Sequence, residues 1–357
     1  MLYYIFKKII FLFEPEFSHK LTFKLLNILD KLKVLDLYEI FNKNKFKLDF
    51  NPDFNPDRKF NHLKFKNKLG LAAGVDKNGE YILPISKLGF GFIEVGTITP
   101  KPQIGNAKPR LFRLKDQEAI INRMGFNNIG IDNLIKNIIK TKNKLSKNNI
   151  ILGVNIGKNA ATPIEKAIDD YLICFEKAYL ISDYICINIS SPNTQNLRNL
   201  QEKEYLNNLL SQITLKRQDL INIHQKHTPI ALKIAPDLTF NEIADICDLI
   251  IKYKIDIIIA TNTTNEDKLL YNKDNMKIMG GLSGRPLCNK SNSILVQVVD
   301  YFKSKDYRKN IIIIAVGGIG SVEDAQHKLS LGADLIQLYT GLVYKGPKLA
   351  RDILTSI

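Results

Sequence analysis

Asp183-Tyr-Ile-Cys-Ile187, followed directly by Asn188-Ile-Ser-Ser-Pro-Asn-Thr194, is the stretch from which the fold of this chain is best predicted. The first five residues form a short apolar segment that predicts a buried strand. The run 188–194 then places amide and hydroxyl side chains at the C-terminal end of that strand, where Pro192 restricts the turn. Such side chains can hydrogen-bond a flat polar ring, because asparagine offers both a donor and an acceptor. The same residues are common in simple turns, so the run alone leaves both interpretations open.

The order of short apolar segment, polar loop and helical stretch recurs from Leu69 to the C-terminus. The expected strands are 69–72, 92–95, 151–154, 184–187, 230–234, 257–260, 311–316 and 335–338. Strands at this spacing with helices between them form parallel βαβ units, and eight units predict an α/β fold, the closed (β/α)₈ TIM barrel. A doubly wound open sheet is the alternative, but no G-x-G-x-x-G opens a helix after the first strand.

The first forty residues differ from the rest of the chain. Residues 1–13 are densely apolar and aromatic, and Glu14-Pro15 should end this segment. A second helical pattern places apolar side chains on one face, and lysines are available to the other; these are Leu21, Leu25, Ile28, Leu29 and Leu32 against Lys20, Lys24 and Lys31. We expect residues 1–41 to form a helical hairpin that lies in a membrane interface, or one that packs on the domain's own core. Residues 42–357 would form the barrel domain, with a polar connector over 42–66.

Composition sets broad limits on function. The chain has 357 residues, of which 45% are apolar and 24% charged, as in a soluble globular protein. The net charge of +15 indicates an anionic partner, or a compositional bias, since lysine and asparagine are spread along the whole chain. The four cysteines form no C-x-x-C pair, so neither a zinc site nor a cysteine-ligated iron–sulfur cluster is predicted, and no metal is expected. No run of 18 apolar residues and no secretory cleavage pattern is present.

Polar or glycine residues follow nearly every expected strand. They are Gly74, Asp76 and Lys77; Gly96 and Thr97; Asn155; the run 188–194; Lys233; Thr261 and Asn262; Gly317 and Gly318; and Tyr339 and Thr340. In a barrel these positions converge on the C-terminal face, where active sites lie. Two glycine-bearing segments, Gly280-Gly-Leu-Ser-Gly-Arg285 and Val316-Gly-Gly-Ile-Gly320, suit a phosphate group, because glycine lets backbone N–H groups approach an oxyanion. The sequence therefore predicts a site for a phosphorylated cofactor.

Eight motifs carry a resemblance to a known family. They are Ala72-Ala-Gly-Val-Asp-Lys77, Glu94-Val-Gly-Thr-Ile-Thr-Pro-Lys-Pro102, Pro109-Arg-Leu-Phe-Arg113, Asn122-Arg-Met-Gly-Phe126, Asn188 to Thr194, Lys233-Ile-Ala-Pro-Asp237, Ala260-Thr-Asn-Thr-Thr264 and Gly281-Leu-Ser-Gly-Arg-Pro286. With them the chain resembles, over essentially its whole length, the dihydroorotate dehydrogenases of the membrane-associated, quinone-using class. The resemblance implies oxidation of dihydroorotate to orotate in de novo pyrimidine (UMP) biosynthesis, with one non-covalent FMN per subunit and a membrane quinone as electron acceptor.

The resemblance also implies roles for individual residues. FMN contacts are expected from Ala73, Gly74, Thr97, Asn155, Asn188, Lys233, Thr261, Gly284, Gly318, Tyr339 and Thr340. Substrate contacts are expected from Lys77, Asn122, Arg123, Met124, Gly125, Phe126, Asn188, Asn193, Asn262 and Thr263. Ser191 matches the catalytic base, for which Thr194 and water are candidate relay partners. Arg113 and His19 are candidate polar groups on the quinone side.

Ser191 and the N-terminal extension both favour the quinone class, because soluble members of the family use cysteine as the base and lack the extension. The hairpin would then open a tunnel for the quinone and hold the protein peripherally on the cytoplasmic side of the cell membrane. Two alternatives stay open. One is the same FMN barrel with a soluble acceptor, fumarate or NAD; the other is a non-enzymatic basic protein that binds membranes or nucleic acid.

Overall fold

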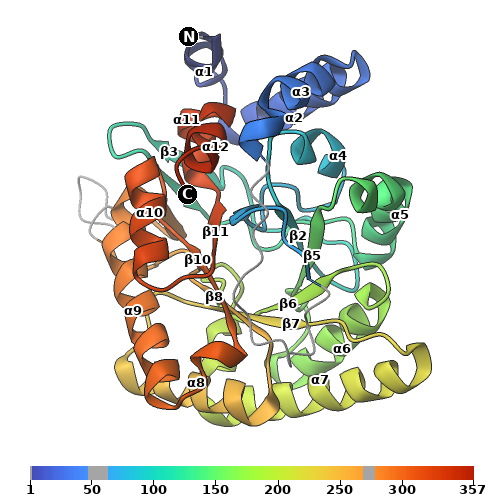
Figure 1. The fold of residues 1–357 in the computed structure, drawn as a ribbon. Helices are drawn as coiled ribbons and strands as arrows, with labels where there is room; N and C mark the ends of the chain where they lie inside the picture. The colour runs from blue at the N-terminus through green and yellow to red at the C-terminus, as the bar shows by residue number, and fades with distance from the viewer. Residues whose placement is uncertain (1, 47–62, 268–277) are drawn as a thin grey trace.

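A closed barrel of eight parallel strands lies at the centre of the computed structural model, which describes residues 2–46, 63–267 and 278–357 (Figure 1). In order around the ring the strands are β1 (Leu69–Leu71), β2 (Phe92–Ile98), β5 (Ile151–Ile156), β6 (Tyr184–Asn188), β7 (Ile230–Ile234), β8 (Ile257–Ala260), β10 (Ile312–Val316) and β11 (Leu335–Leu338), and β11 pairs with β1. Each expected strand is one of these eight, so the TIM-barrel prediction is confirmed. Most of the expected connector, residues 47–62, lies outside the described residues.

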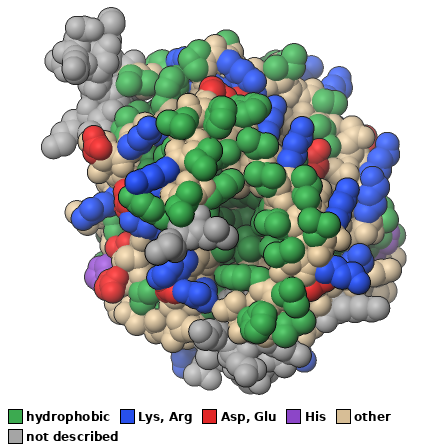
Figure 2. Space-filling model, turned by 90° about the horizontal axis from the view of Figure 1, so that it is seen from above, with side chains coloured by type: hydrophobic (Ala, Val, Ile, Leu, Met, Phe, Trp, Pro, Cys, Tyr) green, Lys and Arg blue, Asp and Glu red, His purple; other side chains and the backbone are tan. Residues whose placement is uncertain are grey.

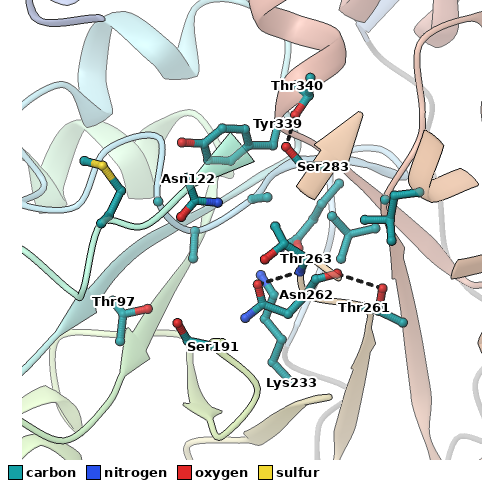
Figure 3. A pocket seen from close by; sticks show the side chains of 18 of the residues that line it. Thr97, Asn122, Ser191, Lys233, Thr261, Asn262, Thr263, Ser283, Tyr339 and Thr340 are labelled. Atoms are coloured by element: carbon teal, nitrogen blue, oxygen red, sulfur yellow. Dashed lines mark hydrogen bonds between the residues drawn. The ribbon is translucent and has the colours of Figure 1, made fainter. Parts of the chain in front are cut away.

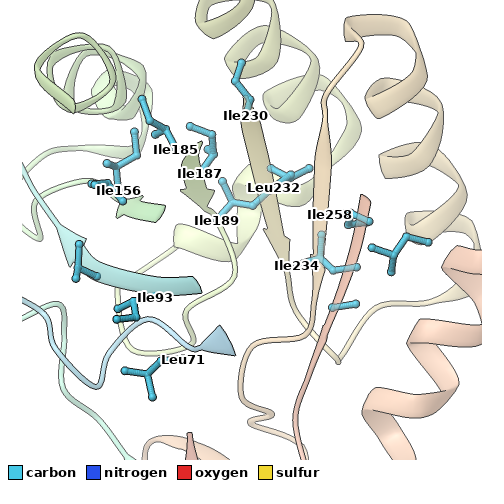
Figure 4. Packing of buried hydrophobic residues seen from close by; sticks show 14 of the residues in the cluster. Leu71, Ile93, Ile156, Ile185, Ile187, Ile189, Ile230, Leu232, Ile234 and Ile258 are labelled. Carbon is cyan, nitrogen blue, oxygen red and sulfur yellow. The ribbon is translucent and has the colours of Figure 1, made fainter. Parts of the chain in front are cut away.

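Side chains along each barrel strand alternate between two hydrophobic cores, one inside the barrel and one between the barrel and the surrounding helices. Tyr184 and Cys186 of β6 pack inside the barrel, whereas Ile185 and Ile187 pack outward beneath the helices (Figure 4). This is the period of two that a strand imposes on its side chains. Gly153 on the neighbouring strand leaves the space that Tyr184 fills, because a Cβ there would lie 2.1 Å from the tyrosine ring. The same alternation points Asn188, at the end of β6, into the mouth of the barrel.

Helices surround the barrel, and most of them follow a barrel strand in the chain (Figure 1). They are α4 (Ile82–Ser86), α5 (Ile131–Lys147), α6 (Ala167–Ala178), α7 (Lys203–His224), α8 (Phe240–Tyr253), α9 (Cys288–Ser304), α10 (Val322–Ser330), α11 (Thr340–Lys345) and α12 (Pro347–Leu354), with short 3₁₀ turns η1 (Ile164–Lys166), η2 (Leu197–Gln201), η4 (Arg285–Leu287) and η5 (Arg308–Asn310). The helix α8 begins with a capping box, in which Thr239 and Glu242 bond each other's backbone N–H groups.

A second, antiparallel sheet was not expected from the sequence. It consists of β3 (Leu111–Leu114), β4 (Ala119–Asn122) and β9 (Gly281–Gly284), and β4 is its central strand. Tyr344 of α11 donates a hydrogen bond to the Ala119 carbonyl at 2.9 Å and so ties this sheet to the barrel. The sheet pairs Asn122 of β4 with Gly281 of β9.

The N-terminal helical extension is confirmed, and it contains three helices where two were expected: α1 (Leu2–Ile10), α2 (Pro15–Lys31) and α3 (Val34–Phe46). Lys33 interrupts the second helical stretch with a φ of 60°. The boundary expected at residue 41 therefore lies inside α3. The helix α2 packs on α3 and α4, and α1 leans on α11, where Tyr3 donates to the Val343 carbonyl at 2.8 Å.

A buried ion pair joins α2 to the residue that precedes β3 of the antiparallel sheet. Arg110 donates from Nε to Glu16 Oε2 at 3.0 Å and from a terminal nitrogen to Oε1 at 2.8 Å. A further guanidinium nitrogen donates to the carbonyls of Ile104 and Asn106. Both ion-pair residues are only 4% exposed. The N-terminal helices are thus held by a bidentate charged contact as well as by apolar packing.

The outer side of these helices is apolar. Ile28 is 50%, Leu32 68% and Phe41 81% exposed. Figure 2 looks down on this end and shows hydrophobic side chains gathered around a hollow, with Lys and Arg side chains among them. No helix among the described residues is long and apolar enough to cross a membrane.

Candidate active site

One large cavity opens at the C-terminal ends of the barrel strands (Figure 3). It holds about 1000 Å³ of non-protein space, its open mouth included. The residues expected in the site that line it are Ala73, Gly74, Lys77, Thr97, Asn122, Met124, Gly125, Phe126, Asn188, Ser191, Asn193, Lys233, Thr261, Asn262, Thr263, Gly284, Gly318, Tyr339 and Thr340. These residues come from the barrel strand ends and from the antiparallel sheet, so the predicted convergence on one face is observed.

Amide and hydroxyl groups form one wall of the cavity. The Asn188 side-chain amide donates to Thr97 Oγ1 at 2.8 Å and to Asn155 Oδ1 at 3.1 Å. Asn155 is fully buried and does not line the cavity, although a direct cofactor contact was expected from it. It lies behind Thr97 and Asn188 and fixes the direction in which their polar atoms point.

Glu94 lies inside the barrel and holds the side chains behind this wall by hydrogen bonds. It was not among the expected site residues. Its carboxyl group is completely buried and accepts hydrogen bonds from Asn155 at 2.8 Å, Tyr184 at 2.9 Å and Gln337 at 3.0 Å. Gln337 in turn lines the cavity. A glutamate in the middle of an apolar strand is a signal that could have identified this network, because buried polar groups need hydrogen-bond partners.

Several buried polar atoms face the cavity without a protein partner. Lys233 is 5% exposed, extends toward Asn262 (Figure 3), and forms no hydrogen bond or ion pair within residues 2–46, 63–267 and 278–357. Gln337 Oε1 and Thr263 Oγ1 are likewise buried without partners among the described residues. Leaving such groups unpaired is costly, so the wall is built to receive a ligand with hydrogen-bonding groups. A flavin ring, with its alternating N–H and C=O groups, fits this donor and acceptor set.

The other end of the cavity suits a phosphate group. Gly317 and Gly318 have φ angles of 118° and 79°, and a Cβ on Gly318 would lie 2.4 Å from Cys288 Cα. The backbone is therefore exposed to the cavity and pressed against the start of α9. Beside it, the hydroxyl groups of Ser283 and Thr340 lie 2.8 Å apart. Backbone N–H groups and hydroxyls in this arrangement are suited to phosphate oxygens, so the residues present fit flavin mononucleotide.

The serine expected as the base and the lysine expected to bind substrate both line the cavity. Ser191 is 6% exposed, and its Oγ accepts the Asn193 backbone N–H at 3.2 Å. Lys77 donates to the Gly74 carbonyl at 3.1 Å; burial lowers its pKa to about 8, partly offset by the Glu16 carboxylate. The amide of Asn193 donates to Asn122 Oδ1 at 2.9 Å. A half-buried cation beside amide pairs is an arrangement that binds a small carboxylate with ring amides.

Arg123, expected to contact the substrate, does not reach the cavity. Its guanidinium donates twice to the Pro109 carbonyl, at 3.0 and 2.8 Å, and lies over the Phe112 ring. The guanidinium therefore points away from the cavity, while its neighbours Asn122 and Met124 line the cavity, and the expected contact of residue 123 with substrate stays a prediction. Alternation along the chain explains the difference, since adjacent extended residues face opposite sides.

The two quinone-side candidates lie between the N-terminal helices and the barrel domain. Arg113 donates to the Phe13 carbonyl and stacks on Phe11, with 4.4 Å from the guanidinium carbon to the ring centroid. His19 packs against Phe23 in a tilted ring contact, with 4.7 Å between ring centroids. Burial, and then the charge of Lys77, lowers the pKa of His19 to about 4, so the imidazole is neutral at physiological pH.

No group of three or more His, Cys, Asp or Glu side chains that could hold a metal ion occurs in the part of the chain that the structure describes. The polar groups of the cavity are instead amides, hydroxyls and lysines, which favour an organic ligand.

Comparisons with known proteins agree with the site. Residues 57–357 match the family model described as Dihydroorotate dehydrogenase. The chain is 48% identical to the dihydroorotate dehydrogenase (quinone) of Buchnera aphidicola subsp. Schizaphis graminum over the full length of both, and 52% identical to that of Aliivibrio salmonicida over 83% of this chain and 85% of the relative. Among solved structures, Eimeria tenella DHODH in complex with ferulenol is similar, with a TM-score of 0.76, 35% identity, and coverage of 90% of this chain and 89% of that one. The chain therefore belongs to the dihydroorotate dehydrogenase family, in its quinone-dependent class.

Proposed function

We propose that this protein oxidises dihydroorotate to orotate in pyrimidine biosynthesis, with bound FMN as the redox group and a membrane quinone as the final acceptor. One observation carries the proposal: a single cavity contains a buried serine, a buried and a half-buried lysine and a set of paired amides, with a glycine-lined end suited to phosphate. When bound, FMN would supply hydride and electron transfer, which no side chain of the chain provides.

Binding and orientation of the substrate fall to Lys77 and the asparagines. Lys77 is placed to pair with the substrate carboxylate, and Asn122, Asn193 and Asn262 are placed to satisfy the ring amide groups. The amide of Asn262 is held by the Ser190 hydroxyl at 3.0 Å, so it is oriented before substrate arrives. Such preorganisation places the substrate C5–H next to the base.

Ser191 Oγ would take the proton from C5. A serine hydroxyl is a weak base, so it needs a closed site and a route for its own proton. Thr194 is a candidate for that route, because its buried hydroxyl has no protein partner among the described residues. On the other side of the site, the Lys233 ammonium would stabilise negative charge that develops on the reduced flavin ring.

The N-terminal helices would deliver the quinone. Their exposed apolar side chains favour peripheral attachment to the cytoplasmic face of the cell membrane, with lysines at the headgroup level. His19 and Arg113 lie along the contact between these helices and the barrel domain, where a quinone could approach the flavin.

An acceptor comparison tests the proposal. Purified protein given dihydroorotate should reduce a short-chain quinone analogue rapidly and fumarate or NAD far more slowly. Equal or faster reduction of fumarate or NAD would replace the quinone assignment with the soluble-acceptor alternative. No flavin and no oxidation of dihydroorotate with any acceptor would refute the enzymatic function altogether.

A paired variant tests the membrane surface. Leu12→Ser with Phe41→Ser removes two side chains that are each 81% exposed, so folding should be unaffected, while binding to vesicles of acidic phospholipid should weaken. Ile223→Ser on α7, where the side chain is 69% exposed, is the matched control and should bind vesicles like the wild type. Unchanged vesicle binding by the double variant would exclude this surface as the membrane contact.

A further inference from the structure

Lys328 of α10 is a buried amine that takes no part in the proposed chemistry. Its side chain has no exposed surface, and Nζ donates to Ser291 Oγ at 2.9 Å and to Asn292 Oδ1 at 2.7 Å, both on α9. It forms no ion pair with any carboxylate of the described residues. The acidic groups that act on it are the Asp324 carboxylate and the Cys288 thiol.

Neither of these groups forms an ion pair with Lys328, and the Asp324 carboxylate offsets the lysine charge only in part. The Asp324 carboxylate accepts the Gly320 backbone N–H at 2.9 Å and the Asp324 backbone N–H bonds Ser321 Oγ, so this residue serves the start of α10. Burial raises the pKa of the Cys288 thiol, which keeps it neutral. An unpaired ammonium in the protein interior is expensive unless an anion comes close. The described residues therefore leave part of the lysine charge unbalanced, and a nearby anionic ligand would balance it.

The Lys328 amine is linked to the glycine loop at the phosphate end of the cavity. Ser291 Oγ, which receives the lysine hydrogen bond, lies 3.0 Å from the Gly317 carbonyl oxygen. A Cβ on Gly317 would lie 3.0 Å from Ser291 Cβ, so loop and helix are in close contact at this point. Lys328 thus lies behind Gly317 and Gly318, separated from the cavity by one layer of side chain and backbone.

We propose that Lys328 is the internal counter-charge for the phosphate group of the bound cofactor. It is a positioning residue: it holds the Gly317 segment through Ser291 and adds positive potential behind the backbone N–H groups, without touching the ligand. This inference rests on the proposed function, since it requires a flavin whose phosphate occupies the glycine-lined end.

Riboflavin, which has the same ring but no phosphate, separates this role from a merely structural one. Lys328→Met keeps the volume of the side chain and removes its charge. In the full-length apoprotein, we expect the FMN dissociation constant to rise about tenfold or more, and the riboflavin dissociation constant to stay near the wild-type value. Lys309→Met, which removes an exposed lysine on η5, is the control and should change neither constant. Quenching of flavin fluorescence measures both ligands.

Equal weakening of FMN and riboflavin by Lys328→Met would overturn the proposal, and so would no change in either. If the variant does not fold, the wild type provides the test. Burial lowers the pKa of Lys328 to about 8, and a nearby phosphate should raise it, so FMN binding should weaken relative to riboflavin binding as pH rises through that value. A ratio of the two constants that is flat with pH refutes the proposal. Binding of neither flavin at any pH would instead refute the proposed function.

Discussion

The buried pair of Glu16 and Arg110 allows a sharp test of how the N-terminal helices are held. Among the described residues, Glu16 is the only residue of α2 that forms an ion pair with the buried Arg110 guanidinium, and Glu16→Ala removes this ion pair. Arg110 would keep its hydrogen bonds to the carbonyls of Ile104 and Asn106, at 2.6 and 2.9 Å. The perturbation therefore leaves a partly satisfied cation at the junction between helix and barrel.

The size of the effect follows from burial. Breaking a buried ion pair by removing one partner costs about 3–5 kcal/mol, because the remaining charge stays desolvated. The two carbonyl acceptors of Arg110 place this case at the lower end, about 3 kcal/mol, or roughly a hundredfold in the docking equilibrium. Glu14→Ala is the matched control on the same helix, since Glu14 only caps the N–H groups of Glu16 and Phe17. Loss of such a cap costs about 1 kcal/mol.

Hydrogen exchange of peptides from α2 measures the docking directly. At neutral pH, Glu16→Ala should accelerate exchange in α2 by about a hundredfold and Glu14→Ala by about fivefold, with barrel peptides unchanged. The hydrogen bond from Arg110 lowers the pKa of Glu16 below the ordinary value of a glutamate, so in the wild type this contribution is complete above that ordinary value and is lost as pH falls through the lowered pKa. Equal exchange of α2 in both variants would refute the role given to the ion pair.

Three further outcomes are expected. Ser191→Ala should slow reduction of bound flavin by dihydroorotate by about 10²–10⁴-fold while flavin stays bound, and a near-normal rate in anaerobic stopped flow would remove Ser191 from the role of base. Because the pKa of Lys77 is about 8, its ammonium is lost as pH rises, so the KM for dihydroorotate should increase about tenfold per unit above that pH; a KM that is constant with pH would contradict the pairing of Lys77 with substrate. Gly153→Ala should lower stability by about 1–3 kcal/mol in urea unfolding, since the new Cβ would lie 2.1 Å from the Tyr184 ring; unchanged stability would show that the barrel interior has room there.

Much of the barrel could be predicted because its strands are short, apolar and evenly spaced. Strands such as Ile230–Ile234 and Ile257–Ala260 have the bounds expected from hydrophobicity alone. The antiparallel sheet could not be predicted in this way, since Leu111–Leu114 is half-buried and Gly281–Gly284 consists of two glycines, a leucine and a serine. These segments pair with one another through contacts far apart in the chain, which no local pattern contains.

The site was predictable to the extent that side chains follow strand ends. Lys233 reaches the cavity because it lies on the inward-facing side of β7. Ser191 reaches the cavity because it lies in the loop that follows β6. The side chain of Arg123 is directed at Pro109 and not into the cavity, since a motif identifies a segment and does not give the direction of each side chain. Glu94 was overlooked because it does not line the cavity itself; it accepts hydrogen bonds from Asn155 and Gln337, which lie between it and the cavity.

Single-turnover reduction of the bound flavin tests the central claim most directly. Under anaerobic conditions, mixing the purified holoprotein with dihydroorotate should bleach the flavin absorption and form one orotate per flavin, and a quinone analogue should then restore the colour. A flavin that dihydroorotate leaves oxidised, in a folded protein, would contradict the account.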